Sequence, residues 1–323
     1  MTAARRLTRP LRVVRARSRW ASGLLAHRAE VRAGRALGPR DDRAPIFILG
    51  APRSGTTLLY QLLVEAFEVG YLANAHAEHP TDVVRVEREQ RPRARRDRSD
   101  FESTHGATRE AWGPSEAGEY WYRFFAREPH QVDHAAPEDR TVAELRAAVR
   151  AFSDACGAPV VFKNTLNSLR VPALATALPE ARFLLIERDL TDNARSLLVG
   201  RTKRGDTRAW WGARPAGADT VEADDPGTQV AWQAHQVHAV AQRELARLAP
   251  ERSLHVTYDE LCAAPGDLVD RVATWLAASG AQVERRAGAV LPSSFDRRGG
   301  GQLDAALEAQ LAAGVARVRE DAR

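Results

Sequence analysis

Four short, mostly apolar runs occur along the chain, and longer stretches with helical spacing lie between them. The runs cover residues 46–49, 160–162, 182–186 and 254–256. Each is short enough for a strand and apolar enough to be buried on both faces. In the longer stretches, such as residues 230–248, apolar residues recur every three or four positions. Strands separated by helices predict an α/β fold: a P-loop-like, three-layer α/β/α arrangement in which helices flank a central parallel sheet.

Charge divides the chain into two parts. Residues 1–43 contain twelve arginines against three acidic residues, so they carry +9, while the rest of the chain carries −4. We therefore expect a basic N-terminal arm or amphipathic helix at residues 1–43 and one domain over residues 44–323. Residues 81–110 are crowded with charges and show little periodicity, which predicts an exposed insertion or lid. The charge of the body gives no reason to expect binding to nucleic acid.

Composition narrows the class of protein further. Two cysteines, Cys156 and Cys262, form neither a disulfide framework nor a metal cluster, so a reducing compartment is expected. No apolar run is long enough for a membrane span, and the start lacks the apolar core of a signal peptide, so we expect a cytoplasmic protein. Apolar residues of the arm fall near one helical face and predict a peripheral contact with the inner membrane surface; a solvated, frayed arm is the alternative.

The first predicted strand ends in a glycine-containing turn that opens a helix. The first amides of a helix lack partners within the helix and its dipole is positive there, so such a turn binds anions. Small and hydroxyl-bearing residues fill the turn and the first helical positions: Ser54, Gly55, Thr56 and Thr57. The spacing from Gly50 to Gly55 matches a Walker A loop, but Thr56 stands in place of the Walker lysine. The loop is therefore predicted to bind a ligand without a γ-phosphate, with Arg53 as its cation.

Residues 50–59, with the sequence Gly-Ala-Pro-Arg-Ser-Gly-Thr-Thr-Leu-Leu, resemble the 5′-phosphosulfate loop of the sulfotransferase family. They match the bacterial form, with Arg53 where many cytosolic members have lysine. The resemblance covers about residues 45–276 and is weakest over residues 81–110. It implies 3′-phosphoadenosine 5′-phosphosulfate as the sulfuryl donor and a mechanism that needs no metal.

The same resemblance implies a second part of the donor site. In the family, an arginine at a strand end and a serine eight residues later hold the 3′-phosphate, and Arg188 and Ser196 match this pattern. The family also has a C-terminal segment rich in arginine and glycine, which Arg297, Arg298 and Gly299 resemble. Tyr258 resembles the aromatic contact to adenine, although a tyrosine after a buried strand can also be core packing.

Sulfuryl transfer needs cations for developing oxygen charge and a base for the acceptor hydroxyl. Arg53 is the first predicted cation, and Lys163, at the end of a predicted strand, resembles the family's lysine near the transferred group. Cytosolic members place a histidine two residues after that lysine, whereas this chain continues with asparagine and threonine. Another residue must act as the base. Carboxylates in an aromatic stretch are the preferred candidates and two histidines the alternatives: Glu116, Glu119, His76 and His79.

The aromatic stretch at residues 112–125, together with Trp210 and Trp211, is a candidate acceptor pocket, with core packing as the competing interpretation. The leading hypothesis is sulfuryl transfer to a hydroxyl, or an amine, of a carbohydrate, glycolipid or small metabolite. A nucleotide or small-molecule kinase with a degenerate phosphate loop is one alternative. A non-catalytic, nucleotide-binding module at a membrane surface is the other. Neither the acceptor nor the oligomeric state follows from the sequence.

Overall fold

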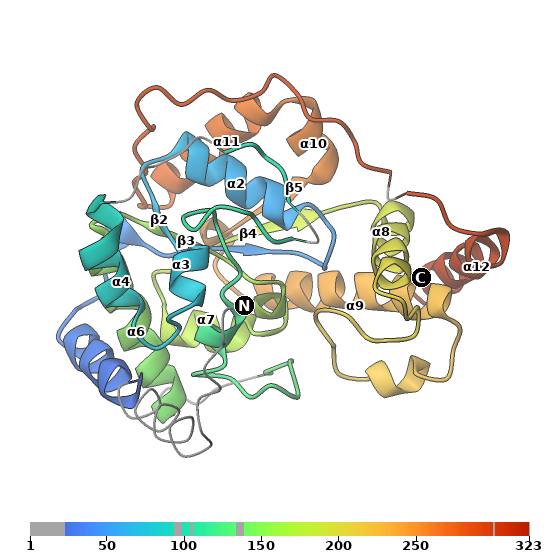
Figure 1. The fold of residues 1–323 in the computed structure, drawn as a ribbon, viewed down its shortest axis with the longest axis horizontal. Helices are drawn as coiled ribbons and strands as arrows, with labels where there is room; N and C mark the ends of the chain where they lie inside the picture. The colour runs from blue at the N-terminus through green and yellow to red at the C-terminus, as the bar shows by residue number, and fades with distance from the viewer. Residues whose placement is uncertain (1–22, 94–98, 104–105, 134–138, 300, 323) are drawn as a thin grey trace, which may run out of the picture.

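The computed structural model describes residues 23–93, 99–103, 106–133, 139–299 and 301–322. Within them, five parallel strands form one central sheet in the order β2-β3-β1-β4-β5 (Figure 1). The strands are β1 (Ile46–Leu49), β2 (Gly70–Tyr71), β3 (Val160–Lys163), β4 (Arg182–Glu187) and β5 (Ser253–Thr257). The predicted α/β fold with a central parallel sheet flanked by helices is confirmed.

Helices connect the strands and cover the sheet. Residues 23–35 form the first helix of the described chain. The later helices are α2 (Thr56–Ala66), α3 (Asn74–Ala77), α4 (Val83–Gln90), α5 (Gly118–Trp121), α6 (Arg140–Cys156), α7 (Val171–Ala177), α8 (Leu190–Lys203), α9 (Pro226–Leu245), α10 (Tyr258–Ala263), α11 (Pro265–Ala278) and α12 (Ala305–Asp321). Among the described residues, no helix combines the length and apolar composition that a membrane span needs.

The two faces of the sheet pack against different helices because alternate strand residues point to opposite sides. On β1, Ile46 and Ile48 join the core formed with α2, α10 and α11. Phe47 and Leu49 join the core formed with α5, α6 and α7. In Figure 1, α6 and α7 lie on the opposite face of the sheet from α2, α10 and α11. Phe47 stacks between Phe162 and Phe183 of the neighbouring strands, with ring centroids 5.3 and 5.6 Å apart. Because all five strands run parallel, their carboxyl ends lie at one edge of the sheet.

Some elements differ from the expectations drawn from the sequence. Neither the two-residue strand β2 nor the helix α12 was predicted from the sequence. The helix α6 begins at Arg140, and the Asp139 carboxylate caps it by accepting from the Thr141 amide at 2.6 Å. The charged segment 81–110 includes α4, whose valines pack into the core, while residues 94–98 and 104–105 lie outside the described chain, so the insertion or lid stays a prediction.

Candidate active site

The loop between β1 and α2 is held open by side chains that bind its backbone. The Ser168 hydroxyl accepts from the Gly50 amide at 2.9 Å and donates to the Gly50 carbonyl at 3.1 Å. Asn193 donates to the Pro52 carbonyl at 2.7 Å. Buried side chains therefore satisfy both carbonyls. The first amides of α2 have no partner within the helix, so they are available to an anion.

Two positions in this loop need a special backbone conformation. Gly55 has φ +103°, and a Cβ atom there would lie 2.5 Å from Cδ2 of Tyr258, so only glycine fits. Arg53 has φ +70°, which is uncommon for a residue with a side chain. Its Nε donates to the Ser196 hydroxyl at 3.2 Å. The unusual backbone therefore turns the Arg53 side chain towards α8.

A second cluster lies at the ends of β4 and β5. Arg188 stacks on the Tyr258 ring at 4.4 Å and donates to the Arg53 carbonyl at 3.1 Å, and its other terminal nitrogen donates to the Arg298 carbonyl. The Arg298 amide donates to the Tyr258 hydroxyl at 3.3 Å. Burial and the charges of Arg188 and Arg298 lower the pKa of Arg53. Three guanidinium groups thus converge on one region, which favours a negatively charged ligand.

The third part of the site surrounds Lys163 at the end of β3. The side chain is 3% exposed, and its ammonium donates to the Thr57 hydroxyl at 2.9 Å and contacts the Glu116 carboxylate. The Asn164 side chain donates to the Glu116 carbonyl at 3.1 Å. The ammonium therefore connects the start of α2 with a carboxylate that is 37% exposed.

One cavity of about 920 Å³ unites these clusters. Eleven of the residues predicted for the site line it: Arg53, Gly55, Thr56, Thr57, Glu116, Lys163, Arg188, Ser196, Tyr258, Arg298 and Gly299. Trp211, predicted as part of an acceptor pocket, also lines it and lies over the Arg53 guanidinium at 5.8 Å.

Three predicted site residues point elsewhere. Ser54 is buried, its amide donates to the Ala51 carbonyl at 3.1 Å, and its hydroxyl lines a small separate cavity. Glu119 is exposed and pairs with Arg127 at 2.7 Å. Arg297 is also exposed and pairs with an aspartate of α10 at 2.7 Å. None of the three contributes a side chain to the large cavity.

The histidine alternatives for the base lie outside the cavity as well. His76 is fully buried between the rings of Trp112 and Phe152. Its Nδ1 accepts from the Ala73 amide at 2.9 Å, and its Nε2 lies 3.1 Å from the Glu87 carboxylate. His79 is exposed and lines no part of the cavity. His76 thus has a structural role in the packing of α3.

Most of the aromatic stretch at residues 112–125 belongs to the core rather than to an acceptor pocket. Tyr120 and Trp121 are fully buried, and Trp121 packs on Phe47 and Phe162 of the sheet. The structure adds cavity residues that the sequence analysis did not single out: Phe101, Glu102, Thr165, Lys203 and Phe295. One signal was present for Lys203, because the chain has only two lysines and both line this cavity.

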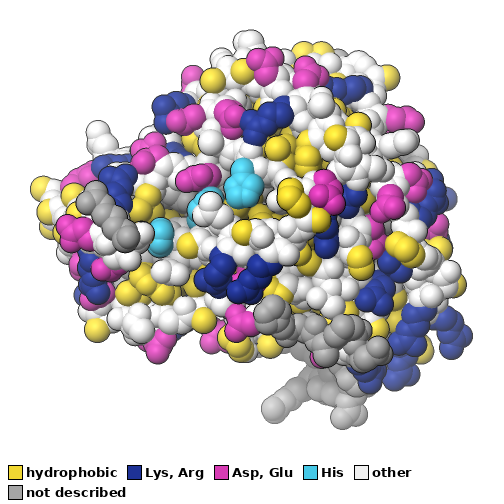
Figure 2. Space-filling model, turned by 180° about the vertical axis from the view of Figure 1, so that it is seen from behind, with side chains coloured by type: hydrophobic (Ala, Val, Ile, Leu, Met, Phe, Trp, Pro, Cys, Tyr) yellow, Lys and Arg dark blue, Asp and Glu magenta, His cyan; other side chains and the backbone are white. Residues whose placement is uncertain are grey.

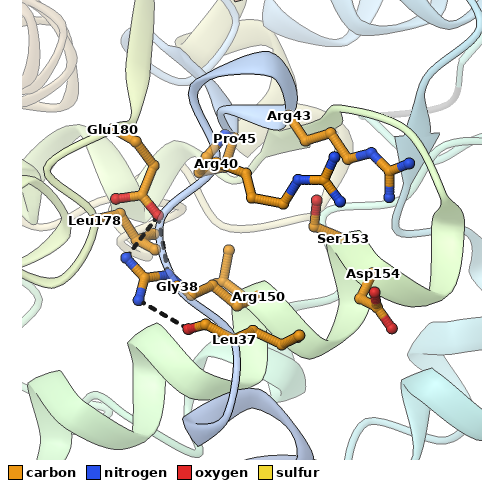
Figure 3. Close-up of a pocket in the computed structure, with 11 residues that line it drawn as sticks. Leu37, Gly38, Arg40, Arg43, Pro45, Arg150, Ser153, Asp154, Leu178 and Glu180 are labelled. Carbon is orange, nitrogen blue, oxygen red and sulfur yellow. Dashed lines mark hydrogen bonds and ion pairs between the residues drawn. The ribbon is translucent and has the colours of Figure 1, made fainter.

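A second cavity, near the start of β1, measures only about 50 Å³ (Figure 3). Arg150 dominates it, pairing with Glu180 at 2.9 Å and donating to the Leu37 carbonyl at 3.2 Å. Its volume holds a few water molecules at most, and two of its arginines, Arg150 and Arg40, are paired with Glu180 and Asp42. This cavity therefore lies where the segment that follows the first helix meets α6, and the large cavity is the candidate active site.

A glycine-containing loop at the carboxyl edge of a parallel sheet, with cations converging on it, is the arrangement of α/β proteins that hold phosphorylated ligands. The sequence matches the Sulfotransferase family over residues 45–279. The chain therefore belongs to the sulfotransferase family, and it is an enzyme of that class.

Solved structures with a similar fold include three bacterial sulfotransferases. Sulfotransferase STF9 from Mycobacterium avium shares 19% identity with a TM-score of 0.49, over 85% of this chain and 68% of that one. Sulfotransferase STF1 from Mycobacterium tuberculosis shares 16% with a TM-score of 0.46, over 73% and 67%. A sulfotransferase from Alicyclobacillus acidocaldarius shares 15% with a TM-score of 0.42, over 85% and 92%. The comparison with curated proteins found no match.

Proposed function

We propose that the protein transfers the sulfuryl group of 3′-phosphoadenosine 5′-phosphosulfate to a hydroxyl, or an amine, of a carbohydrate, glycolipid or small-metabolite acceptor. The observation that carries this proposal is the convergence of five cations on one cavity: Arg53, Lys163, Arg188, Lys203 and Arg298. The donor carries negative charge at its 5′-phosphosulfate and at its 3′-phosphate, so it needs cations at two places. Arg53 and Lys163 would serve the first, and Arg188 and Arg298 the second.

The residues around Arg188 fit a 3′-phosphate. The Arg188 Nε is buried, and no described residue accepts a hydrogen bond from it. Leaving such a donor unsatisfied is costly, and a phosphate oxygen would satisfy it. Ser196, which lines the same cavity, offers a hydroxyl, and the Tyr258 ring offers a surface on which adenine would stack.

The loop residues fit the 5′ end of the donor. The amides of Gly55, Thr56 and Thr57 and the positive end of α2 favour a phosphate there. Because the Lys163 ammonium already binds the Thr57 hydroxyl, it is positioned to stabilise charge on the phosphate oxygen that leaves. Arg53 acts from the other side of the loop.

In the transfer, the hydroxyl oxygen or amine nitrogen of the acceptor attacks the sulfur while the bond between sulfur and the 5′-phosphate oxygen breaks. The acceptor is thereby sulfated, and 3′-phosphoadenosine 5′-phosphate leaves. We assign Glu116 as the base that accepts the proton of the acceptor, because its carboxylate lines the cavity beside Lys163. Thr165 occupies the position of the histidine that the cytosolic members use, so a base from another segment is required.

Comparing three nucleotides tests the donor assignment. We expect 3′,5′-ADP to bind much more tightly than 5′-ADP or ATP in a calorimetric titration, because only the first carries a 3′-phosphate. Arg188→Ala should weaken 3′,5′-ADP binding by roughly 30- to 100-fold, as for the loss of a charge-assisted hydrogen-bond pair. Arg297→Ala is the matched control, since Arg297 lies outside the cavity.

ATP binding as tight as 3′,5′-ADP would favour the kinase, an alternative that the family match does not support. Binding of 3′,5′-ADP without transfer of labelled sulfate to any class of acceptor would favour the non-catalytic module, which that match likewise does not support. A screen of carbohydrates, glycolipids and small hydroxylated metabolites with the labelled donor identifies the acceptor. The cytoplasmic location and the reducing compartment remain predictions.

A further inference from the structure

The helix at residues 23–35 is fixed on the body of the protein. Gly34 packs against α6 so closely that a Cβ atom there would lie 1.7 Å from the Ala147 carbonyl oxygen. Glu30 is 4% exposed and forms an ion pair of 3.1 Å with Arg123. These contacts lie on one side of the helix and determine which residues face outward.

The outward side combines arginines with exposed leucines. Its residues are Leu24, Leu25, Arg28, Arg32 and Arg35, all of them exposed. At 3.6 residues per turn they fall within about 100° of the helix circumference. Leu24 and Leu25 are 37% and 66% exposed, and Val290 is the only other large hydrophobic side chain with such exposure in the described part of the chain. Two adjacent leucines in water beside three arginines make an amphipathic surface.

Positive charge on this side of the molecule is not neutralised. None of the three arginines forms an ion pair with another described residue. Figure 2 shows Lys and Arg side chains gathered at the lower right of the back face, where the first helix of Figure 1 lies. The preceding residues 1–22 are outside the described chain, and their sequence contains seven arginines and no acidic residue.

We propose that the outer face of this helix docks on an anionic phospholipid membrane. Each cation near such a surface strengthens binding about fivefold. The two leucines favour a membrane over a nucleic acid as the anionic partner of this face. A phosphodiester backbone would neutralise the arginines but leave Leu24 and Leu25 in water, whereas the boundary between headgroups and acyl chains takes both kinds of side chain.

Co-sedimentation of the full chain with vesicles tests this proposal. We expect binding to vesicles that mix phosphatidylglycerol with phosphatidylcholine, little binding to pure phosphatidylcholine, and weakening by salt. Changing Leu24 and Leu25 together to serine should weaken the partition by at least about tenfold. Changing Arg28, Arg32 and Arg35 together to glutamine should weaken it by about a hundredfold.

Two matched controls separate this face from general surface effects. Val290→Ser removes an exposed hydrophobic side chain elsewhere, and changing Arg243, Arg247 and Arg317 to glutamine removes three exposed arginines elsewhere. Both controls should bind vesicles as the unaltered protein does, and circular dichroism confirms that every variant is folded. Absence of binding to the anionic vesicles overturns the proposal. The proposal is also overturned if the double leucine variant binds the vesicles as strongly as the unaltered protein, or if the controls lose as much binding as the variants of this face.

Discussion

The two carboxylates that the sequence offers as the base lie three positions apart, and the structure places them in different surroundings. Glu116 contacts the ammonium of Lys163 inside the cavity, whereas Glu119 pairs with Arg127 in solvent. The reason is the burial of Tyr120 and Trp121, which turns the outer face of α5, and Glu119 with it, away from the cavity. The orientation of this short helix thus decides which of the two carboxylates reaches the cavity, and residue type alone does not.

Replacing these two carboxylates separately tests the assignment of the base. Glu116→Gln should lower the rate of sulfate transfer by about 10²- to 10⁴-fold, as for the loss of a general base, with little change in 3′,5′-ADP affinity. Glu119→Gln should keep the full rate. Initial rates with labelled donor measure both. Equal rates for Glu116→Gln and the unaltered enzyme would show that another group takes the proton.

Glu102 lies close to a group that we assign to the donor. Both oxygens of its carboxylate lie 2.9 Å from one terminal nitrogen of Arg298 and accept hydrogen bonds from it. A 3′-phosphate must therefore compete with this carboxylate for Arg298. Both side chains are more than half exposed, so the competing ion pair is worth at most about 1 kcal/mol.

Glu102→Gln should consequently tighten 3′,5′-ADP binding by up to about fivefold, because the amide competes less well for Arg298 than the carboxylate does. The affinity for 5′-ADP, which lacks the 3′-phosphate, should change much less. Titration calorimetry with both nucleotides gives the comparison. An equal gain for both would mean that Glu102 acts only through the overall charge of the cavity.

At the scale of elements, the segment that follows β3 organises the site. Lys163 ends the strand. The Asn164 side chain donates to the Glu116 carbonyl, and the Ser168 hydroxyl binds the backbone of Gly50, just after the neighbouring strand β1. One short segment therefore fixes the Lys163 ammonium, the proposed base Glu116 and the start of the loop after β1 relative to each other. The contacts depend on the pairing of β1 with β3.

Ser168→Ala should loosen the phosphate loop. The change leaves the buried amide and carbonyl of Gly50 without this partner, which costs about 1 to 3 kcal/mol of unfolding free energy and weakens donor binding. Ser153→Ala in α6 is the control, because Ser153 forms one long hydrogen bond of 3.4 Å far from the loop. Urea denaturation and 3′,5′-ADP titration measure the two effects. Loss of stability with unchanged donor affinity would contradict the role of Ser168 in the loop.

At the scale of the whole molecule, the first helix is attached through a group that titrates near neutral pH. Burial raises the pKa of Glu30 to about 7, although Arg123 opposes the shift. A carboxyl with a raised pKa stabilises the packing of this helix on the body of the protein. The stabilisation is complete at pH values below the pKa of the unfolded chain and is lost as the pH rises through about 7. His27 acts in the opposite direction, because burial and Arg123 lower its pKa.

Hydrogen exchange of the helix at residues 23–35 tests this pH dependence. Relative to Glu30→Gln, whose side chain stays neutral, the unaltered protein should lose protection in the helix between pH 5 and pH 8, by an amount on the order of 3 kcal/mol. The comparison with the variant isolates Glu30 from His27. The same pH dependence in both proteins would mean that Glu30 is not the titrating group.

Much of the fold followed from local patterns in the sequence. The four apolar runs became β1, β3, β4 and β5. The first three are buried along almost their whole length, as an inner strand of a covered parallel sheet must be, whereas β5 lies at the edge and buries only Val256. The strand β2 escaped notice since two residues carry no periodicity. The helix α12 packs on α9 through the close approach of Gly314 to Thr228, which depends on two distant segments.

The sequence by itself determined the parallel α/β fold, the glycine-containing turn at Gly50 and the family, since strand, turn and helix signals are all local. Only the tertiary structure decided which of several similar side chains reach the cavity. Glu116 and Arg298 line it, whereas Glu119 and Arg297 face solvent. The physical reason is that a side chain's direction depends on which face of its segment is buried, and that burial is set by residues far away in the chain.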